Sequence, residues 1–125
     1  LRALGDICAR HDVLVVTDEM HGDLVFSGSR YTPFASLGPA YSDNCITCLS
    51  PAKTFNIASC CSAFTVITDD RKRKAFQAEN SRLTVNKNNA FANVAMEAAY
   101  TQGGPWLDEV LAYLEENVRL VRRRV

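Results

Sequence analysis

Two short apolar runs constrain the fold of this chain more than any other feature. They are Val-Leu-Val-Val-Thr at residues 13–17 and Cys-Ile-Thr-Cys-Leu at residues 45–49. Apolar residues that follow one another without alternation are typical of a strand covered on both faces of a sheet. A helical spacing of apolar residues over positions 1–8 leads into the first run. The order helix, strand, loop, strand predicts an α/β fold.

The remaining elements follow from local signals along the chain. Residues 22–43 are rich in Gly, Ser, Pro and Tyr and predict a long loop with at most a short helical turn at residues 34–37. A third strand is predicted over Ser62 to Thr68, and three helices complete the chain. These helices run from Asp69 to about Arg82, from Asn88 or Asn89 to Tyr100, and from Pro105 to the end.

The last helix carries a mostly apolar stripe, which predicts packing rather than a site. Its members are Trp106, Val110, Tyr113, Leu114, Asn117, Leu120 and Val121. The helical pattern still continues at Val125 and the chain starts at Leu1, so both ends are expected to be cut from a longer protein. We therefore expect residues 1–125 to be one part of a larger domain.

Composition excludes several classes of function. Fourteen basic residues balance fourteen acidic ones, so no net charge draws the chain to nucleic acid or to an anionic membrane. No apolar stretch approaches the roughly 20 residues of a membrane span. The five cysteines are expected to be reduced, which favours a cytoplasmic protein. Cys45 and Cys48 would face opposite sides of a strand, so we expect no metal site there.

Polar side chains follow both apolar runs directly. Asp18 and His21 come after the first run, and Ser50 and Lys53 come after the second. Open α/β sheets bind ligands beyond the carboxyl ends of their strands, so these groups could share one cleft. An amine, an anion and hydroxyls match the needs of pyridoxal 5′-phosphate (PLP): Lys53 for the aldehyde, Asp18 for the pyridine nitrogen, and Ser50 with Thr54 for the phosphate.

The residues around these groups carry a resemblance to a known family. The segments Thr17-Asp18-Glu19-Met20-His21-Gly22-Asp23 and Ser50-Pro51-Ala52-Lys53-Thr54-Phe55-Asn56-Ile57 resemble fold-type-I PLP enzymes of the aminotransferase kind. The branch that the chain most resembles is the cystathionine β-lyase-like (MalY/PatB-type) C–S lyases. The resemblance continues through residues 97–103 and 106–117, so it spans essentially the whole chain.

The resemblance implies a role for each site residue. Lys53 resembles the catalytic lysine that bonds to the cofactor, Asp18 the partner of the pyridine nitrogen, and Ser50 a phosphate ligand. His21 resembles a residue that touches the cofactor's phenolic oxygen. The resemblance also implies the fold: the chain would be part of a three-layer α/β/α large domain with a mostly parallel sheet, followed by helices. It would be the central to C-terminal portion of this PLP-binding domain, without the small domain, and the intact enzyme would be a homodimer acting on an amino acid.

The same comparison shows what differs and what lies outside these residues. Ser59 and Cys60 stand where the family often has Gly-Leu, and Tyr31 stands where it often has His. The group that stacks on the cofactor, most of the phosphate cradle and the arginine that grips the substrate carboxylate are expected in other segments. The isolated chain is therefore expected to be inactive.

Three other interpretations compete with a C–S β-lyase that releases thiol, pyruvate and ammonia. A PLP-dependent class I/II aminotransferase shares every step up to loss of the Cα proton. A non-catalytic remnant or assembly domain would keep the fold without the chemistry. Ser50-x-x-Lys53 as the pair of a penicillin-binding-type acyl transferase needs Ser-Asp-Asn and Lys-Thr-Gly triplets. Ser-Asp-Asn occurs at residues 42–44, but Lys-Thr-Gly does not occur, because Lys53-Thr54 continues with Phe55.

Overall fold

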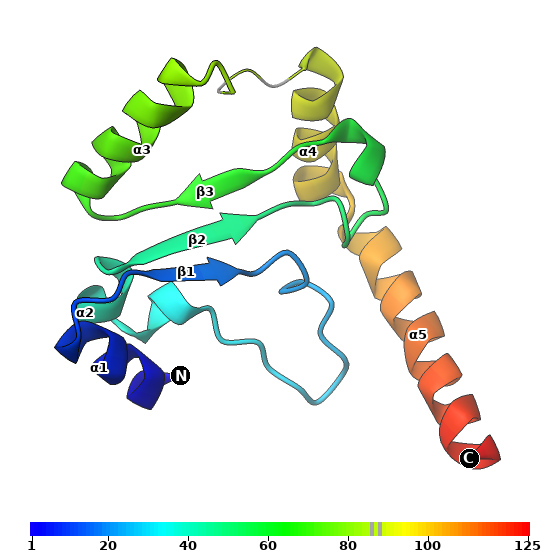
Figure 1. Ribbon diagram of the computed structural model, residues 1–125. Helices are drawn as coiled ribbons and strands as arrows, with labels where there is room; N and C mark the ends of the chain where they lie inside the picture. The colour runs from blue at the N-terminus through cyan, green and yellow to red at the C-terminus, as the bar shows by residue number, and fades with distance from the viewer. Residues whose placement is uncertain (86, 88) are drawn as a thin grey trace.

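The computed structural model describes residues 1–85, 87 and 89–125, and a three-stranded mixed sheet lies at its centre (Figure 1). The strands lie in chain order, β1 (Val15–Asp18), β2 (Cys45–Leu49) and β3 (Phe64–Val66). β1 and β2 are parallel with Asp18 opposite Cys48, whereas β3 pairs antiparallel with β2. The described part of the sheet therefore has one parallel and one antiparallel pair, where the sequence predicted a mostly parallel sheet.

The strand predictions differ in accuracy. The second strand is confirmed residue for residue over Cys45–Leu49. The first begins later than its apolar run, because Val13 donates its N–H to the Cys8 carbonyl (2.8 Å) and belongs to the turn after the first helix. The third is shorter than predicted, and a 3₁₀ turn that the sequence analysis missed, η2 (Ala58–Cys60), precedes it.

The two faces of the sheet differ in how far they are covered. Cys45 and Thr47 are buried on the face that η1 (Phe34–Leu37) and α2 (Pro39–Ser42) cover. Val16, on the opposite face of β1, is 62% exposed. The prediction that the first apolar run is covered on both faces is therefore wrong for these residues, because no described element packs over Val16.

The helices largely follow their sequence signals. α3 (Asp70–Arg82) begins after Asp69, whose carboxylate accepts the Lys72 N–H at 2.7 Å. α4 (Ala90–Gln102) begins after Asn89, whose side-chain oxygen accepts the Ala92 N–H at 2.7 Å. The alternative start at Asn88 lies outside the described residues. α1 (Arg2–Arg10) and α5 (Gly104–Arg124) complete the set.

One helical turn was not predicted within the long loop. The turn expected at residues 34–37 is present as η1, but α2 follows it directly. Pro39 stands in the first turn of α2, where its fixed backbone angle is suited to a helix start. Phe34 and Tyr41 stack edge to face at 6.1 Å between ring centroids, and both contact the position where Gly5 of α1 would carry a Cβ. Gly5 therefore lets α1 approach this pair closely.

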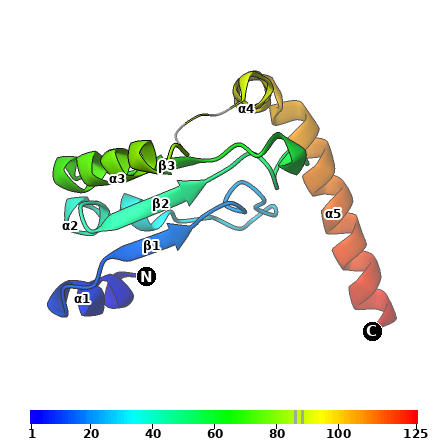
Figure 2. The ribbon, with the colours of Figure 1, turned by 45° about the horizontal axis from the view of Figure 1, so that its top comes forward.

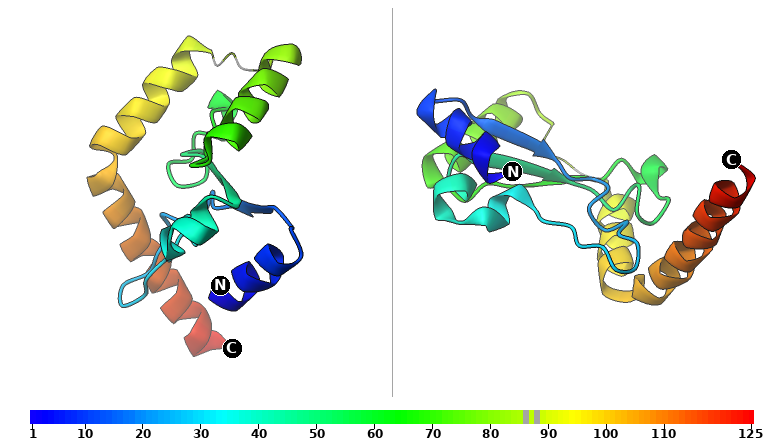
Figure 3. Two further views of the ribbon diagram at one scale, coloured as in Figure 1. Left: turned by 90° about the vertical axis from the view of Figure 1, so that its left-hand side faces the viewer. Right: turned by 90° about the horizontal axis from the view of Figure 1, so that it is seen from below.

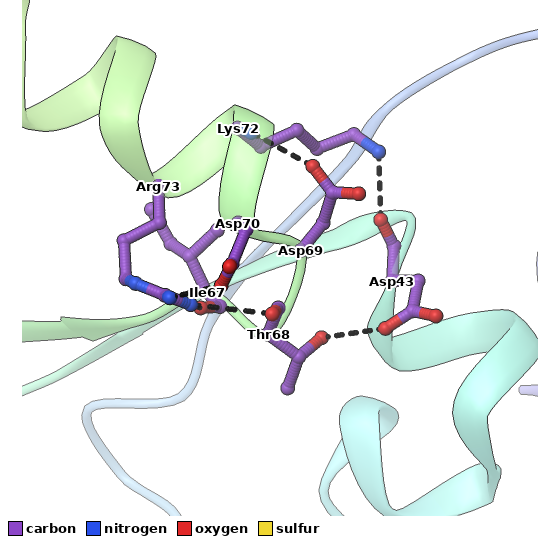
Figure 4. Close-up of polar contacts among 7 residues, drawn as sticks. All are labelled: Asp43, Ile67, Thr68, Asp69, Asp70, Lys72 and Arg73. Atoms are coloured by element: carbon purple, nitrogen blue, oxygen red, sulfur yellow. Dashed lines mark hydrogen bonds and ion pairs between the residues drawn. The ribbon is translucent and has the colours of Figure 1, made fainter.

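Polar contacts fix the end of the sheet where α3 begins (Figure 4). Thr68 donates its hydroxyl to the Asp43 carboxylate at 3.0 Å, and the Lys72 amine donates to the Asp43 carbonyl at 2.7 Å. Arg73 donates to the carbonyls of Ile67 (2.9 Å) and Thr68 (3.2 Å) and pairs with Asp70. These contacts join α3 to the turn before β2, at the opposite end of the sheet from the Lys53 segment.

α4 and α5 flank the end of the sheet toward which β1 and β2 point (Figures 1 and 2). α5 then runs away from the sheet, and Figure 3 shows its C-terminal end far from the strands. Much of the predicted apolar stripe of α5 is uncovered: Trp106 is 44%, Tyr113 68% and Val121 58% exposed. No helix in the described part of the chain has the length and apolar character needed to cross a membrane.

The core of the chain is small for its mass. The accessible surface is 8963 Å², whereas a compact monomer of this mass exposes roughly 6,600 Å² by the usual scaling of area with mass. Large apolar side chains as exposed as Phe91 (85%) and Val94 (68%) account for part of the difference. Such a surface is typical of a piece of a larger packed unit.

Candidate functional site at the carboxyl edge of the sheet

Asp18 ends β1 on the open face of the sheet. Its carboxylate is exposed, and its Oδ1 accepts the Met20 N–H at 3.2 Å. The parallel register places Asp18 opposite Cys48, and the pairing continues as Glu19 donates its N–H to the Cys48 carbonyl at 2.9 Å. Burial raises the pKa of the Cys48 thiol, and the neighbouring Asp18 carboxylate raises it further. Asp18 therefore stands beside the last residues of β2, close to where the Lys53 segment begins.

Lys53 lies in a tight turn that follows β2. Pro51, Ala52 and Thr54 around it are buried, but Lys53 itself is exposed. Two backbone bonds close the turn, from the Phe55 N–H to the Pro51 carbonyl (2.9 Å) and from the Ile57 N–H to the Ala52 carbonyl (3.1 Å). The Lys53 amine makes no hydrogen bond or ion pair with the residues that the structure describes. A rigid backbone thus presents a free amine.

Ser50 begins the turn, and its hydroxyl group makes two hydrogen bonds. It is 3% exposed, donates its O–H to the Ser62 carbonyl at 2.6 Å and accepts the Ala52 N–H at 3.0 Å. The first bond joins the Lys53 segment to the residues just before β3. Ser62 is also 3% exposed, and its own hydroxyl oxygen is buried without a partner among the described residues. Two buried serine hydroxyls therefore lie next to the turn.

Aromatic rings hold the turn from the side of α4 and α5. The Phe55 ring lies 5.8 Å from the Tyr100 ring, edge to face, and 6.0 Å from the Trp106 ring between centroids. Gly103, between the two helices, leaves space for Phe55: a Cβ there would lie 2.5 Å from its ring. Asn56 closes the turn with φ 54°, a left-handed conformation that asparagine tolerates better than most residues.

Thr54 connects the turn to the loop after β1. Its side chain is 1% exposed, and its hydroxyl donates to Asp23 Oδ2 at 3.1 Å. The sequence analysis gave Asp23 no role, because nothing in the spacing reveals a contact between positions 31 residues apart. The only hint of this role in the sequence was that Asp23 is a second acidic residue shortly after Asp18.

His21 and Glu19 differ in their surroundings. His21 is exposed, and its backbone carbonyl accepts the Leu24 N–H at 3.1 Å. Glu19 is 8% exposed and accepts the Phe34 N–H at 3.0 Å. Burial, a hydrogen bond to Glu19 and the charges of Glu19 and Asp23 raise the pKa of Tyr31 to about 12. Tyr31 therefore stays neutral and helps to hold the loop.

A hollow of about 270 Å³ lies beside this loop, on the face of the sheet opposite Asp18. Its lining is mostly apolar and comes from the loop, β2 and β3: Glu19, Gly22, Asp23, Tyr31, Pro33, Ala35, Thr47, Leu49 and Val66. None of the residues that the sequence analysis assigned to the site lines this hollow. The fold thus places Asp18, Ser50, Lys53 and Thr54 at one edge of the sheet, with His21 in the adjoining loop.

The comparisons with known proteins identify the family of the chain. The family model of class I and II aminotransferases matches residues 1–125. The chain is 48% identical over 118 residues to cystathionine beta-lyase PatB of Bacillus subtilis, covering 94% of this chain and 30% of PatB. It is 33% identical over 122 residues to protein MalY of Escherichia coli, covering 97% of this chain and 30% of MalY. It thus spans about 30% of the length of these relatives.

A solved structure supports the same assignment. The PLP-bound C–S lyase from Staphylococcus hominis superposes with a TM-score of 0.86 at 32% identity, over 96% of this chain and 29% of that one. The α/β fold predicted from the sequence is therefore confirmed as part of such an enzyme fold. Because the family model covers every residue and the relatives align over nearly the whole chain, this chain belongs to the class I and II aminotransferase family.

Proposed function

We propose that the protein to which this chain belongs is a PLP-dependent C–S β-lyase, and that residues 1–125 form the central to C-terminal portion of its PLP-binding large domain. The observation that carries the proposal is the free amine of Lys53 on a fixed turn at the same sheet edge as the Asp18 carboxylate. The names of its relatives, cystathionine beta-lyase and C–S lyase, support the reaction type.

The chemistry of the donor groups fits PLP. Lys53 supplies an amine for the cofactor's aldehyde, and Asp18 supplies an anion for its pyridine nitrogen. Ser50 and His21 supply polar groups beside them. Asp18 is suited to its role because only one of its oxygens has a hydrogen bond within the described residues, to Met20. Ser50 can turn its hydroxyl toward a phosphate only by releasing the Ser62 carbonyl.

When bound, PLP supplies an electron sink for the negative charge that develops at the substrate's Cα. The Lys53 amine, when it is not bonded to the cofactor, would remove the substrate's Cα proton as a general base. The Asp18 carboxylate would hold a proton on the cofactor's pyridine nitrogen. A thiolate then leaves from Cβ, so that a cysteine thioether and water give a thiol, pyruvate and ammonia.

An aminotransferase is the second candidate, because the matching family is named for that activity. Lys53 and Asp18 would have the same roles in both reactions. The two differ in where the proton returns and in whether a leaving group sits on Cβ. A catalytically inert remnant is disfavoured by the intact set of Lys53, Asp18 and Ser50.

We further propose that the intact enzyme is a cytoplasmic homodimer that acts on a small amino acid. Reduced cysteines support the compartment: all five are free, and Cys45 is buried in the core. The uncovered apolar side chains, such as Phe91 and Tyr113, support burial against further parts of the enzyme or a second subunit.

The reaction type is tested with the full-length enzyme and cystathionine or a cysteine S-conjugate. The expected result is release of pyruvate, ammonia and a thiol without any keto-acid acceptor. An equal amount of an amino acid without a leaving group on Cβ serves as the control and is expected to give no pyruvate. Product that forms only with added 2-oxoglutarate, with glutamate in equal amount, identifies an aminotransferase instead.

A further inference from the structure

The Asp23–Thr54 hydrogen bond joins the two segments that carry the site. Thr54 directly follows Lys53, and Asp23 lies in the loop after Asp18. The bond is 3.1 Å long, and the Thr54 side chain that makes it is 1% exposed. A hydrogen bond to a charged group, shielded on one side from water, is among the stronger polar contacts in proteins. It is therefore placed to restrain the backbone on which Lys53 stands.

The charge of Asp23 also acts on groups from other elements. It contributes to the raised pKa values of Tyr31, in the long loop, and of Tyr100, in α4, although burial is the larger cause for both. Tyr100 in turn contacts Phe55, the second residue after Lys53. The Lys53 turn is thus held by Asp23, through Thr54, and by the aromatic rings, through Phe55.

The Thr54 hydroxyl carries a single proton, and Asp23 accepts it. While this bond is made, Thr54 cannot donate to a phosphate. We propose that Asp23 and Thr54 are a pair of positioning residues, which orient Lys53 toward Asp18, and that Thr54 acts through Asp23 rather than on the cofactor directly. This inference rests on the proposed PLP chemistry at Lys53 and adds Asp23 to the residues on which that chemistry depends.

The test uses the full-length holoenzyme and four variants of the pair: Thr54→Val, Thr54→Ser, Asp23→Ala and the double variant Asp23→Ala/Thr54→Val. Thr54→Val keeps the shape but removes the hydroxyl, whereas Thr54→Ser keeps the hydroxyl. Thr68→Val is the matched control, because Thr68 also donates its hydroxyl to an aspartate, Asp43, at the other end of the sheet (Figure 4).

A displaced Lys53 lowers kcat more than it weakens binding. We expect Thr54→Val and Asp23→Ala each to lower kcat by about ten- to a hundredfold, with KM changed by less than about twofold. The double variant is expected to match the single variants within about twofold, because both remove the same bond. Thr54→Ser is expected to restore most of the loss, and Thr68→Val to behave as wild type.

A second measurement needs no turnover. The bound cofactor's visible absorbance is titrated with pH in the absence of substrate, and its midpoint reports the surroundings of Lys53. Thr54→Val and Asp23→Ala are expected to shift this midpoint alike, while Thr68→Val leaves it unchanged. If Thr54→Val does not fold, Asp23→Ala, at an exposed loop position, provides the same comparison.

Three outcomes would contradict the proposed role of Asp23 and Thr54. Wild-type kcat and midpoint in Thr54→Val remove any positioning role. Losses that multiply in the double variant show that the two residues act separately. Weaker PLP binding by Thr54→Val with an unchanged kcat shows that Thr54 binds the phosphate directly. The lyase proposal is tested separately, by the products that the wild type releases. The ratio of variant to wild-type kcat can be measured for whichever reaction the wild type catalyses, so it tests the pair alone.

Discussion

At the scale of single residues, the proposed chemistry depends most on Lys53. The chain has three other lysines, and Lys72 is already engaged with the Asp43 carbonyl at 2.7 Å. Lys53, in contrast, is exposed on a turn whose neighbours are buried. Because the turn already holds the backbone, bonding of this amine to an aldehyde has to order only the Lys53 side chain, which favours it as the cofactor's attachment point.

We therefore expect the cofactor of the full-length enzyme to be attached to Lys53. Borohydride reduction followed by peptide mass mapping is expected to place a phosphopyridoxyl group on Lys53. Lys53→Ala, reduced in the same way, is the control and is expected to carry none. A label on Lys72, Lys74 or Lys87 in the wild type would remove Lys53 from the centre of the site.

Asp18 is expected to act on the electron sink rather than on attachment. Asp18→Asn keeps the size and the hydrogen bond to the Met20 N–H but removes the negative charge. Turnover is expected to fall by orders of magnitude while the bound cofactor's visible absorbance remains. Asp12→Asn, outside the site in the turn after α1, provides a control for the loss of one surface carboxylate. Unchanged turnover in Asp18→Asn would contradict the assignment.

At the scale of elements, the junction of α4 and α5 supports the Lys53 turn. Gly103 separates the two helices, and a Cβ there would lie 2.4 Å from the Ala99 carbonyl oxygen and 2.5 Å from the Phe55 ring. Gly104, its neighbour, has nothing within 4 Å of the same position. Of these two adjacent glycines, therefore, only Gly103 has to lack a side chain for the helices to pack closely against Phe55.

Gly103→Ala is expected to move the Phe55 ring and with it the turn that carries Lys53. Overpacking of this kind lowers stability by about 1–3 kcal/mol. In the full-length enzyme the variant is expected to melt several degrees lower and to lose activity, as measured by thermal denaturation and turnover. Gly104→Ala is expected to be neutral or slightly stabilising. Equal effects of both substitutions would show that Phe55 can move without consequence.

At the scale of the whole molecule, the described residues expose more apolar surface than an independent domain. The open face of β1 and the stripe of α5 are uncovered, with Val16 at 62% and Tyr113 at 68% exposure. The residues that would stack on PLP and grip the substrate carboxylate are expected outside this segment. The chain by itself therefore offers an amine and an anion but little to order the cofactor.

We expect the isolated chain to bind PLP weakly or not at all. Spectroscopic titration is expected to show no saturable, stoichiometric binding, and a dye that binds apolar surface is expected to fluoresce strongly. The full-length enzyme is the control and is expected to bind PLP tightly with weak dye fluorescence. Tight, one-to-one binding by residues 1–125 would show that the fragment holds a complete site.

Local signals in the sequence determined the type and place of most elements. The run at 45–49 is a strand at those residues, and the helices predicted to start at Asp69 and at Asn88 or Asn89 are present, with Asp69 and Asn89 as their caps. The position of Lys53 and Asp18 after two successive strands followed from the same reasoning. Caps and apolar runs act over a few residues, so their consequences can be derived without knowing the tertiary structure.

Only the tertiary structure decided how distant residues meet. It paired β3 antiparallel, left one face of β1 open, gave the Ser50 hydroxyl to the Ser62 carbonyl, and brought Asp23 to Thr54 across 31 positions. A hydrogen bond of this kind depends on the three-dimensional course of two loops, and the local sequence of each loop does not determine that course. The sequence alone therefore determined which groups stand at the sheet edge, and the packing of the loops and helices around the turn decided what holds them there.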